Sequence, residues 1–163
     1  MRAKRLGKWL SNSSLRLKLK DEKILEWLHE EGSITKKISA EAEFRLEVLN
    51  DGLGRAQISE YTDMNIDPQL IRIREVLLYG DNKPIVYARS IITPLASSKG
   101  SNDLKNIGNQ PLGDLIFKSK LFINTNRVFA KFKTNTEKTV WGRKTLYKIK
   151  GYPLSIMEVF LGI

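Results

Sequence analysis

The chain has 163 residues and a hydrophobic content of 41%, which suits one globular domain with a sizeable core. With no cysteine and one histidine, His29, it excludes disulfides and thiolate or histidine-rich metal sites, and no apolar run reaches the roughly 18 residues of a membrane span. The formal net charge is +10, yet no helix-turn-helix, zinc-finger or RNA-binding aromatic motif accompanies it, so we do not expect a nucleic acid as the partner.

The positive charge is concentrated in two blocks of the sequence. Residues 1–20 carry seven basic residues and no acid, and residues 131–150 carry seven basic residues and one acid, so the remainder has a net charge of −3. Such blocks attract an anionic membrane surface, a nucleic acid or an anionic small substrate. Residues 1–20 are compatible with a transit-like segment or with a loosely attached first strand or helix. We treat them as a basic N-terminal segment that precedes one domain at residues 21–163.

Two short helices are predicted at the start of this domain. Residues 21–31 form an amphipathic helix with acidic residues at its N-terminus, and glycine follows it. His29 lies off the apolar stripe, so we expect it to face solvent. Ser33 can cap a second helix, in which Ile34 and Ile38 lie one turn apart.

A first strand and two irregular segments follow. Residues 43–50 alternate between apolar and polar side chains, which predicts a strand. Residues 51–54 contain two glycines and are predicted to form a turn, and residues 57–68 are polar and irregular. The Gly-x-Gly at residues 52–54 has no strand–helix unit around it, so it is not a dinucleotide-binding motif.

The most informative stretch is a predicted β-hairpin. Residues 71–79 are rich in apolar and β-branched side chains, residues 80–84 have the composition of a tight turn, and residues 85–93 form the second strand. Pro94 ends that strand, because proline cannot donate a ladder hydrogen bond.

Arg74 lies in the middle of this hairpin, on a face that it shares with apolar residues. With a two-residue turn it lies opposite Arg89, and with a loop one residue longer Glu75 lies opposite Arg89 instead. The sequence is compatible with both registers. A guanidinium at such a place needs a partner, which is either a neighbouring carboxylate such as Glu75 or the carboxylate of a bound ligand.

The second half of the chain contains a long polar loop and three further strands. Residues 95–110 are rich in serine, asparagine, glycine and lysine, which indicates either a lid over a site or an ordinary surface loop. Residues 114–118 are predicted to form a short helix. The three predicted strands are residues 121–133, 140–149 and 154–161.

Glu158 is the second charge that an apolar strand should not hold without a reason. Both faces of the last strand are almost wholly apolar, so its carboxylate is buried whichever face points inward. One interpretation is a buried ion pair between Glu158 and Arg74. The other is a small pocket, with Arg74 holding a substrate carboxylate and Glu158 facing a hydroxyl group or a proton.

These residues belong to an ordered set that resembles the chorismate pyruvate-lyase family. No single piece is diagnostic, but the set spans residues 24–161 in order and at compatible spacings. It consists of Trp27-Leu28, residues 33–37, residues 74–78 with the following turn, Ala88-Arg89, Pro94, residues 111–113, Phe117, residues 141–143, Gly151, Pro153-Leu154 and residues 158–161.

The resemblance implies an α+β fold: a single twisted antiparallel β-sheet with short helices on one side and helical flaps over a buried ligand pocket. It implies a lyase that splits chorismate into 4-hydroxybenzoate and pyruvate, the first step of ubiquinone or plastoquinone biosynthesis, without a metal ion or an organic cofactor. We expect a monomer that binds this substrate and product in the cytoplasm, or in the plastid stroma if the chain is plastid-encoded.

The resemblance also assigns roles to five residues. Arg74 matches the arginine that holds the ring carboxylate, and Glu158 matches the glutamate at the hydroxyl end. Leu112 matches a flap leucine that contacts the ligand through its backbone, and Arg89 matches a second arginine near the site. Ile34 stands where relatives carry methionine, a change that a backbone contact would survive.

Two other functions share this expected fold. The effector-binding domains of some bacterial transcription regulators bind a small carboxylate without converting it, but they normally follow a helix-turn-helix domain, which the basic segment at residues 1–20 cannot supply. A protein that keeps the fold and has lost the activity is the third alternative. The combination of Arg74 with Glu158 favours the enzyme.

Overall fold

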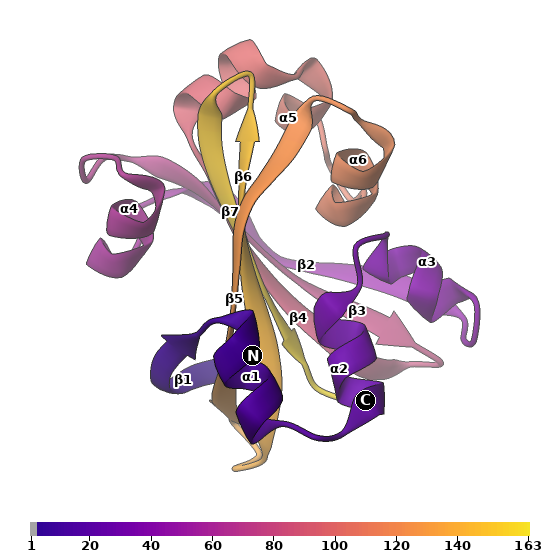
Figure 1. The fold of residues 1–163 in the computed structure, drawn as a ribbon. Helices are drawn as coiled ribbons and strands as arrows, with labels where there is room; N and C mark the ends of the chain where they lie inside the picture. The colour runs from indigo at the N-terminus through magenta and orange to yellow at the C-terminus, as the bar shows by residue number, and fades with distance from the viewer. Residues whose placement is uncertain (1–2) are drawn as a thin grey trace.

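The computed structural model describes residues 3–163 and contains a single seven-stranded antiparallel sheet (Figure 1). The spatial order is β1-β5-β6-β7-β4-β3-β2, so the predicted α+β fold with one antiparallel sheet is confirmed. The strands are β1 (Ala3–Leu10), β2 (Phe44–Gly54), β3 (Ile71–Gly80), β4 (Lys83–Ile92), β5 (Phe122–Thr134), β6 (Thr139–Ile149) and β7 (Tyr152–Phe160).

Short helices cover the sheet. They are α1 (Asn12–Lys18), α2 (Glu22–His29), α3 (Ile34–Ser39), α4 (Ile58–Met64), the π-helical turn η1 (Ala96–Gly100), α5 (Asn102–Lys105) and α6 (Leu112–Lys118). All of them except α4 pack on one side, as predicted, and α4 lies apart against the other face (Figure 1). Between residues 3 and 163, no helix is long and apolar enough to cross a bilayer.

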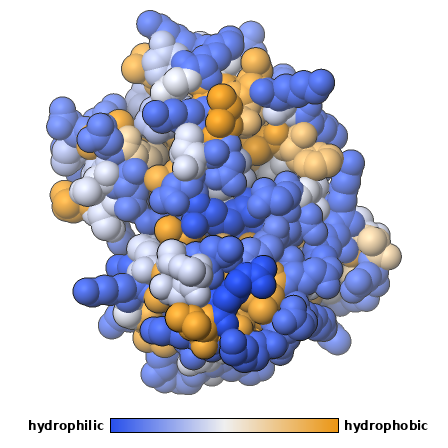
Figure 2. Space-filling view, viewed as in Figure 1, coloured by the Kyte–Doolittle hydropathy of each residue, from blue (hydrophilic) through white to orange (hydrophobic). Residues whose placement is uncertain are grey.

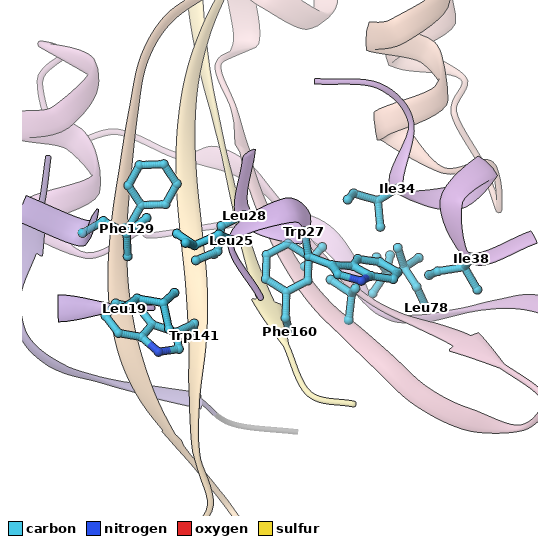
Figure 3. Close-up of a cluster of buried hydrophobic side chains, with 14 residues drawn as sticks. Leu19, Leu25, Trp27, Leu28, Ile34, Ile38, Leu78, Phe129, Trp141 and Phe160 are labelled. Atoms are coloured by element: carbon cyan, nitrogen blue, oxygen red, sulfur yellow. The ribbon is translucent and has the colours of Figure 1, made fainter. Parts of the chain in front are cut away.

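The first helices begin where the sequence supplies capping side chains. The side chains of Ser11, Asp21 and Ser33 accept hydrogen bonds from backbone N–H groups in the first turns of α1, α2 and α3. The apolar residues between these caps form the main core against the sheet (Figure 3). That core contains Leu15, Leu19, Leu25, Trp27, Leu28, Ile34, Ile38, Leu78, Phe129, Trp141 and Phe160.

The basic N-terminal residues extend the predicted domain to residue 3. Strand β1 pairs with β5 at one edge of the sheet, and Leu15 of α1 is fully buried in the main core. The charged side chains of this region point outward. In Figure 2 hydrophilic residues cover most of the visible face, and apolar side chains gather over the upper helices and near α1.

Three local predictions were wrong. Residues 51–54 are the end of strand β2 and not a turn, because a register shift between Val48 and Asn50 lets pairing with β3 continue to Gly54. The polar residues 57–68 contain helix α4, which a capping box starts and two buried apolar side chains hold against the sheet. His29 is half-buried and hydrogen-bonded to Asn12.

The central hairpin has the second of its two predicted registers. Asp81 and Asn82 form a two-residue turn, both with positive φ (48° and 61°). A β-bulge at Ile85 then adds one residue to β4, so the register shifts by one and Glu75 lies opposite Arg89. The bulge therefore combines the shorter turn with the register of the longer loop.

Gly142 of β6 lies where the sheet is too tightly packed to admit a side chain. A Cβ atom at this position would lie 2.7 Å from the carbonyl oxygen of Glu158 and 2.8 Å from the ring of Phe132. We predict that Gly142→Ala lowers the free energy of unfolding by about 1–3 kcal/mol, the usual cost of overpacking. Urea denaturation measures it.

Gly52→Ala is the matched control, because its Cβ would have no neighbour within 4 Å. We expect this variant to unfold at nearly the wild-type urea concentration. Equal stability of the two variants would contradict the packing argument.

Candidate active site

A cavity of about 310 Å³ lies between the sheet and helices α3 and α6. Four of the five residues that the sequence assigned to a site line it: Ile34, Arg74, Leu112 and Glu158. Apolar side chains from β3, β4 and α6 make up much of the remaining wall. A volume of this size suits a ligand built on a single ring.

The guanidinium of Arg74 is buried, with 2% of the side chain exposed, and it pairs with Asp51 of the neighbouring strand. Its Nη1 donates to the Asp51 carboxylate at 2.6 Å, and its Nη2 donates to the backbone carbonyl of Gln110 at 3.1 Å. Of the five N–H donors of an arginine, three have no partner among residues 3–163. Arg74 thus has a counter-charge nearby and still has N–H donors for a ligand carboxylate.

Sequence reasoning missed Asp51 because it assigned residues 51–54 to a turn. In β2 this residue lies directly opposite Arg74, and its carboxylate also binds Arg72 through two hydrogen bonds of 2.7 and 2.9 Å. Burial alone would raise the pKa of Asp51, but the hydrogen bonds and charges of Arg72 and Arg74 hold that pKa below its ordinary value.

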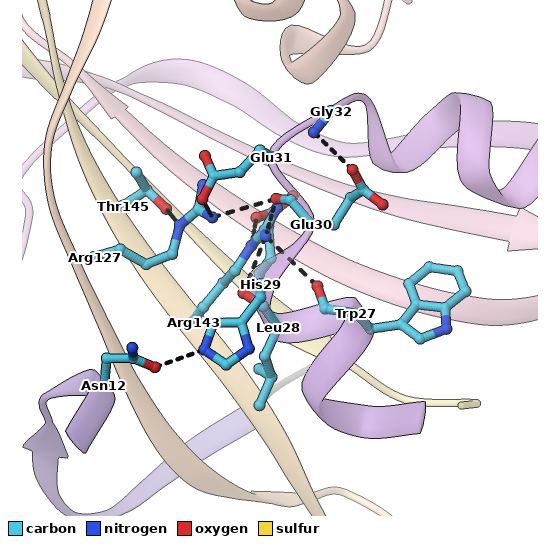
Figure 4. A network of polar contacts seen from close by, with 11 residues as sticks. Asn12, Trp27, Leu28, His29, Glu30, Glu31, Gly32, Arg127, Arg143 and Thr145 are labelled. Carbon is cyan, nitrogen blue, oxygen red and sulfur yellow. Dashed lines mark hydrogen bonds and ion pairs between the residues drawn. The ribbon is translucent and has the colours of Figure 1, made fainter. Parts of the chain in front are cut away.

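Glu158 has its own counter-charge in Arg143, which is 3% exposed. Arg143 Nε donates to Glu158 Oε2 at 2.6 Å, while Nη1 donates to the carbonyls of Leu28 and Glu30 at the end of α2 (Figure 4). Burial would lower the pKa of Arg143, but the charge of Glu158 and its hydrogen bond raise it. The second carboxylate oxygen of Glu158 has no hydrogen-bond partner among residues 3–163.

Arg74 and Glu158 therefore do not form the buried ion pair that was one interpretation of the sequence. Strand β4 separates their strands, and the register places Arg74 level with Ser90 and Ile156, two residues before Glu158. Two strand spacings and two residues along a strand put the Cα atoms of Arg74 and Glu158 about 12 Å apart. Both side chains line the same cavity from the same face of the sheet.

The starts of α3 and α6 cover the cavity. Ile34 and Leu112 are the first residues of these helices and are 4% and 6% exposed. Backbone N–H groups in a first helical turn have no partner within the helix, so both residues can present a donor to a ligand. A hydrogen bond from Ser33 to the Asp114 side chain ties the two helix starts together.

The long polar segment at residues 95–110 is not the cover itself. It forms η1 and α5. Its residues Ala96, Leu104 and Ile107 are buried in a second apolar cluster, the upper core, which also contains Ile92, Leu112, Ile149, Leu154 and Ile156. It is therefore packed onto the sheet, and it leads directly into α6, which does cover the cavity.

The structure does not bring Arg89 into this site, which corrects the expectation drawn from the resemblance. Because Arg89 lies opposite Glu75 in the ladder, it points to the other face of the sheet. There it binds Glu60 with hydrogen bonds of 2.9 and 3.1 Å. Two cavity residues that sequence reasoning missed are Arg143 and Tyr147. Burial and the charge of Glu158 raise the pKa of Tyr147.

Comparisons of the sequence with a family model and with curated proteins point to the same family. A family model described as chorismate lyase matches residues 6–163. A probable chorismate pyruvate-lyase of Pseudoalteromonas translucida is 32% identical over 149 residues, which cover 83% of this chain and 82% of the relative. A chorismate pyruvate-lyase of Pectobacterium atrosepticum is 32% identical over 143 residues, which cover 86% of this chain and 77% of the relative.

Solved structures share this fold at low sequence identity. A GntR-family transcriptional regulator from Enterococcus faecalis aligns with a TM-score of 0.54 and 10% identity, over 75% of this chain and 93% of the regulator. PhnF from Mycobacterium smegmatis aligns with a TM-score of 0.56 and 11% identity, over 97% and 89% of the two chains. At such low identity these similarities concern the fold alone.

The lowered pKa of Asp51 predicts how its contribution to stability depends on pH. A carboxyl group whose pKa is lower in the folded state adds stability that is fully present above its unfolded pKa and is lost as the pH falls through the folded pKa. We predict that the difference in unfolding free energy between wild type and Asp51→Asn is largest at neutral pH and shrinks below about pH 4.

Urea denaturation at pH 7, 5 and 3 measures this difference. Asp67→Asn is the control, because Asp67 is exposed and has no ion pair among residues 3–163, and it should change stability little at any of these pH values. A difference for Asp51→Asn that stays constant down to pH 3 would contradict the assignment.

Proposed function

The chain belongs to the chorismate lyase family, and from this premise we propose that it converts chorismate into 4-hydroxybenzoate and pyruvate. The observation that carries the proposal is the pair of charges in one cavity. Arg74 keeps three N–H donors and Glu158 keeps one carboxylate oxygen without a partner among residues 3–163, and both side chains line one cavity of about 310 Å³.

In the proposed complex Arg74 binds the ring carboxylate of chorismate through charge-assisted hydrogen bonds. At the other end of the ring, the second oxygen of Glu158 accepts a hydrogen bond from the C4 hydroxyl group, which becomes the phenol of the product. The backbones of Ile34 and Leu112 close over the ring. Binding in this way selects a ring that carries a carboxylate and a hydroxyl at opposite positions.

The reaction needs no reagent other than the substrate. The C3–O bond of the enolpyruvyl ether breaks and its electron pair goes to the departing oxygen, while the C4 hydrogen moves to the methylene carbon of the same group and makes the methyl of pyruvate. Loss of the C4 hydrogen leaves an aromatic ring, so the reaction is strongly downhill. The protein orients the substrate and stabilises the charge that develops on the departing oxygen.

Helices α3 and α6, which cover the cavity, also affect the rate of turnover. A closed cavity keeps water from the reacting atoms, and opening it to release 4-hydroxybenzoate can limit the rate. We place the product at the entry to ubiquinone or plastoquinone biosynthesis, as the family resemblance implies.

The activity is tested by mixing the purified protein with chorismate, without added metal or cofactor. We expect 4-hydroxybenzoate and pyruvate to appear in equal amounts, measured by absorbance and by a coupled lactate dehydrogenase assay. Arg74→Ala should lower kcat/KM about a hundredfold or more, because a buried charged contact to the substrate is lost. Glu158→Gln should lower kcat about tenfold or more, because the amide weakens the hydrogen bond and leaves Arg143 without its counter-charge.

Arg55→Ala and Glu41→Gln are the matched controls, because both residues are exposed, and they should retain wild-type kinetics. Binding of 4-hydroxybenzoate without any turnover of chorismate would contradict the lyase proposal. Wild-type rates in both site variants would show that the site had been assigned to the wrong residues.

The route of the C4 hydrogen distinguishes a hydrogen-bonding Glu158 from one that acts as a base. If the hydrogen moves within the substrate, pyruvate formed in D₂O and trapped at once as lactate should carry no deuterium in its methyl group. Mass spectrometry of the lactate measures this. Incorporation of one deuterium per turnover would show that a protein base removes the hydrogen and that the methyl group receives its proton from solvent.

A further inference from the structure

Arg72 lies beside the candidate active site without lining it. It is two residues from Arg74 on the same face of β3, and its side chain is 20% exposed. Its Nε and Nη2 bind both oxygens of Asp51, at 2.7 and 2.9 Å. The remaining nitrogen, Nη1, donates to the backbone carbonyls of Leu104 and Lys105 at 2.9 and 3.2 Å.

These contacts fix Arg72 from both sides. One edge of the guanidinium is held by a bidentate carboxylate, which is a strong and directional contact. The opposite edge is held by two carbonyls at the end of α5, which packs into the upper core through the fully buried Leu104. Arg72 therefore has little freedom to leave Asp51.

The same carboxylate oxygen that accepts from Arg72 Nη2 also accepts from Arg74 Nη1, at 2.6 Å. One negative charge is thus shared between two positive charges, which leaves a net charge of +1 in the three-residue cluster. Without Arg72, Asp51 would neutralise Arg74 alone, and a carboxylate entering the cavity would meet a cluster with no net charge. The repulsion between Asp51 and that carboxylate would then be offset by one arginine and not by two.

We propose that Arg72 is a positioning residue that takes a share of Asp51 away from Arg74 and so keeps the charge of Arg74 available to a ligand carboxylate. The inference rests on the proposed function for the identity of that ligand, and it goes beyond it because Arg72 acts through Asp51 and touches neither the cavity nor the substrate.

The test measures the dissociation constant of 4-hydroxybenzoate by calorimetry, together with KM and kcat for chorismate, on the full chain. Arg72→Gln removes the charge and keeps N–H donors for the α5 carbonyls. Because Asp51 then neutralises Arg74 alone, we expect Kd and KM to rise about tenfold or more. We expect kcat to change less than about threefold, since the reacting atoms keep their contacts.

The double variant Arg72→Gln with Asp51→Asn gives the decisive result. Removing the carboxylate restores the net charge beside Arg74, so binding should recover to within about threefold of wild type, as it does when a coupled pair is removed together. A purely structural role for Arg72 predicts no recovery, because the double variant also weakens the hydrogen bond that Asp51 accepts from Arg74. Arg55→Gln, an exposed arginine near the end of β2, is the control and should bind as wild type.

The outcomes separate this inference from the proposed function. A wild-type protein that binds 4-hydroxybenzoate while Arg72→Gln binds it equally well, or while the double variant binds no better than the single one, overturns the inference alone. A wild-type protein that neither binds 4-hydroxybenzoate nor converts chorismate overturns both.

Circular dichroism checks that each variant is folded. Should Arg72→Gln fail to fold, Arg72→Lys carries the same question, because it keeps the positive charge while losing the bidentate geometry. Charge sharing predicts that the lysine variant binds within about threefold of wild type, and a tenfold loss in a folded lysine variant overturns the inference.

Discussion

The burial of the Arg74 guanidinium in the middle of a sheet is the constraint on which much of this structure depends. An unpaired charge at such a place would be very costly, so the fold must supply a carboxylate within reach. Asp51 provides it, and it does so because β2 continues past residue 50 and brings Asp51 opposite Arg74. The extra length of edge strand β2 therefore supplies the counter-charge of Arg74. Three N–H donors of Arg74 stay without a partner among residues 3–163, and a ligand can use them.

The parts of the fold that follow local rules could be predicted from the sequence. Helix α2 was found from its apolar stripe and the acidic residues at its start, and helix α3 from Ser33 as its cap. Strand β2 was found from its alternation, and the β3–β4 hairpin from two apolar, β-branched runs around a turn. Arg74 and Glu158 were singled out because a charge in an apolar strand is anomalous. The ordered resemblance to a lyase family then gave them roles, which stay predictions, and the structure places both residues in the lining of one cavity.

What could not be predicted depends on single extra residues and on distant partners. A bulge at Ile85 turned Arg89 away from the cavity, and a register shift before Asn50 carried Asp51 into it. Neither irregularity has a clear signal in one sequence, because a one-residue shift preserves composition and reverses every side chain after it. Arg143 was missed for a different reason: its partners are carbonyls more than a hundred residues away.

Glu158 and Arg74, the two charges of the cavity, are held by the same kind of contact, an arginine bound to the carbonyls at a helix end. Glu158 binds Arg143, which ends on backbone carbonyls at the C-terminal end of α2. Arg74 binds Asp51, then Arg72, which ends on carbonyls at the C-terminal end of α5. The last carbonyls of a helix lack partners within it and carry partial negative charge, so a guanidinium is a favourable cap for them. Helices α2 and α5, which do not line the cavity, thereby fix the positions of its charges. A change at either helix end would move Arg143 or Arg72 and so alter the contacts that Glu158 or Arg74 offers a ligand.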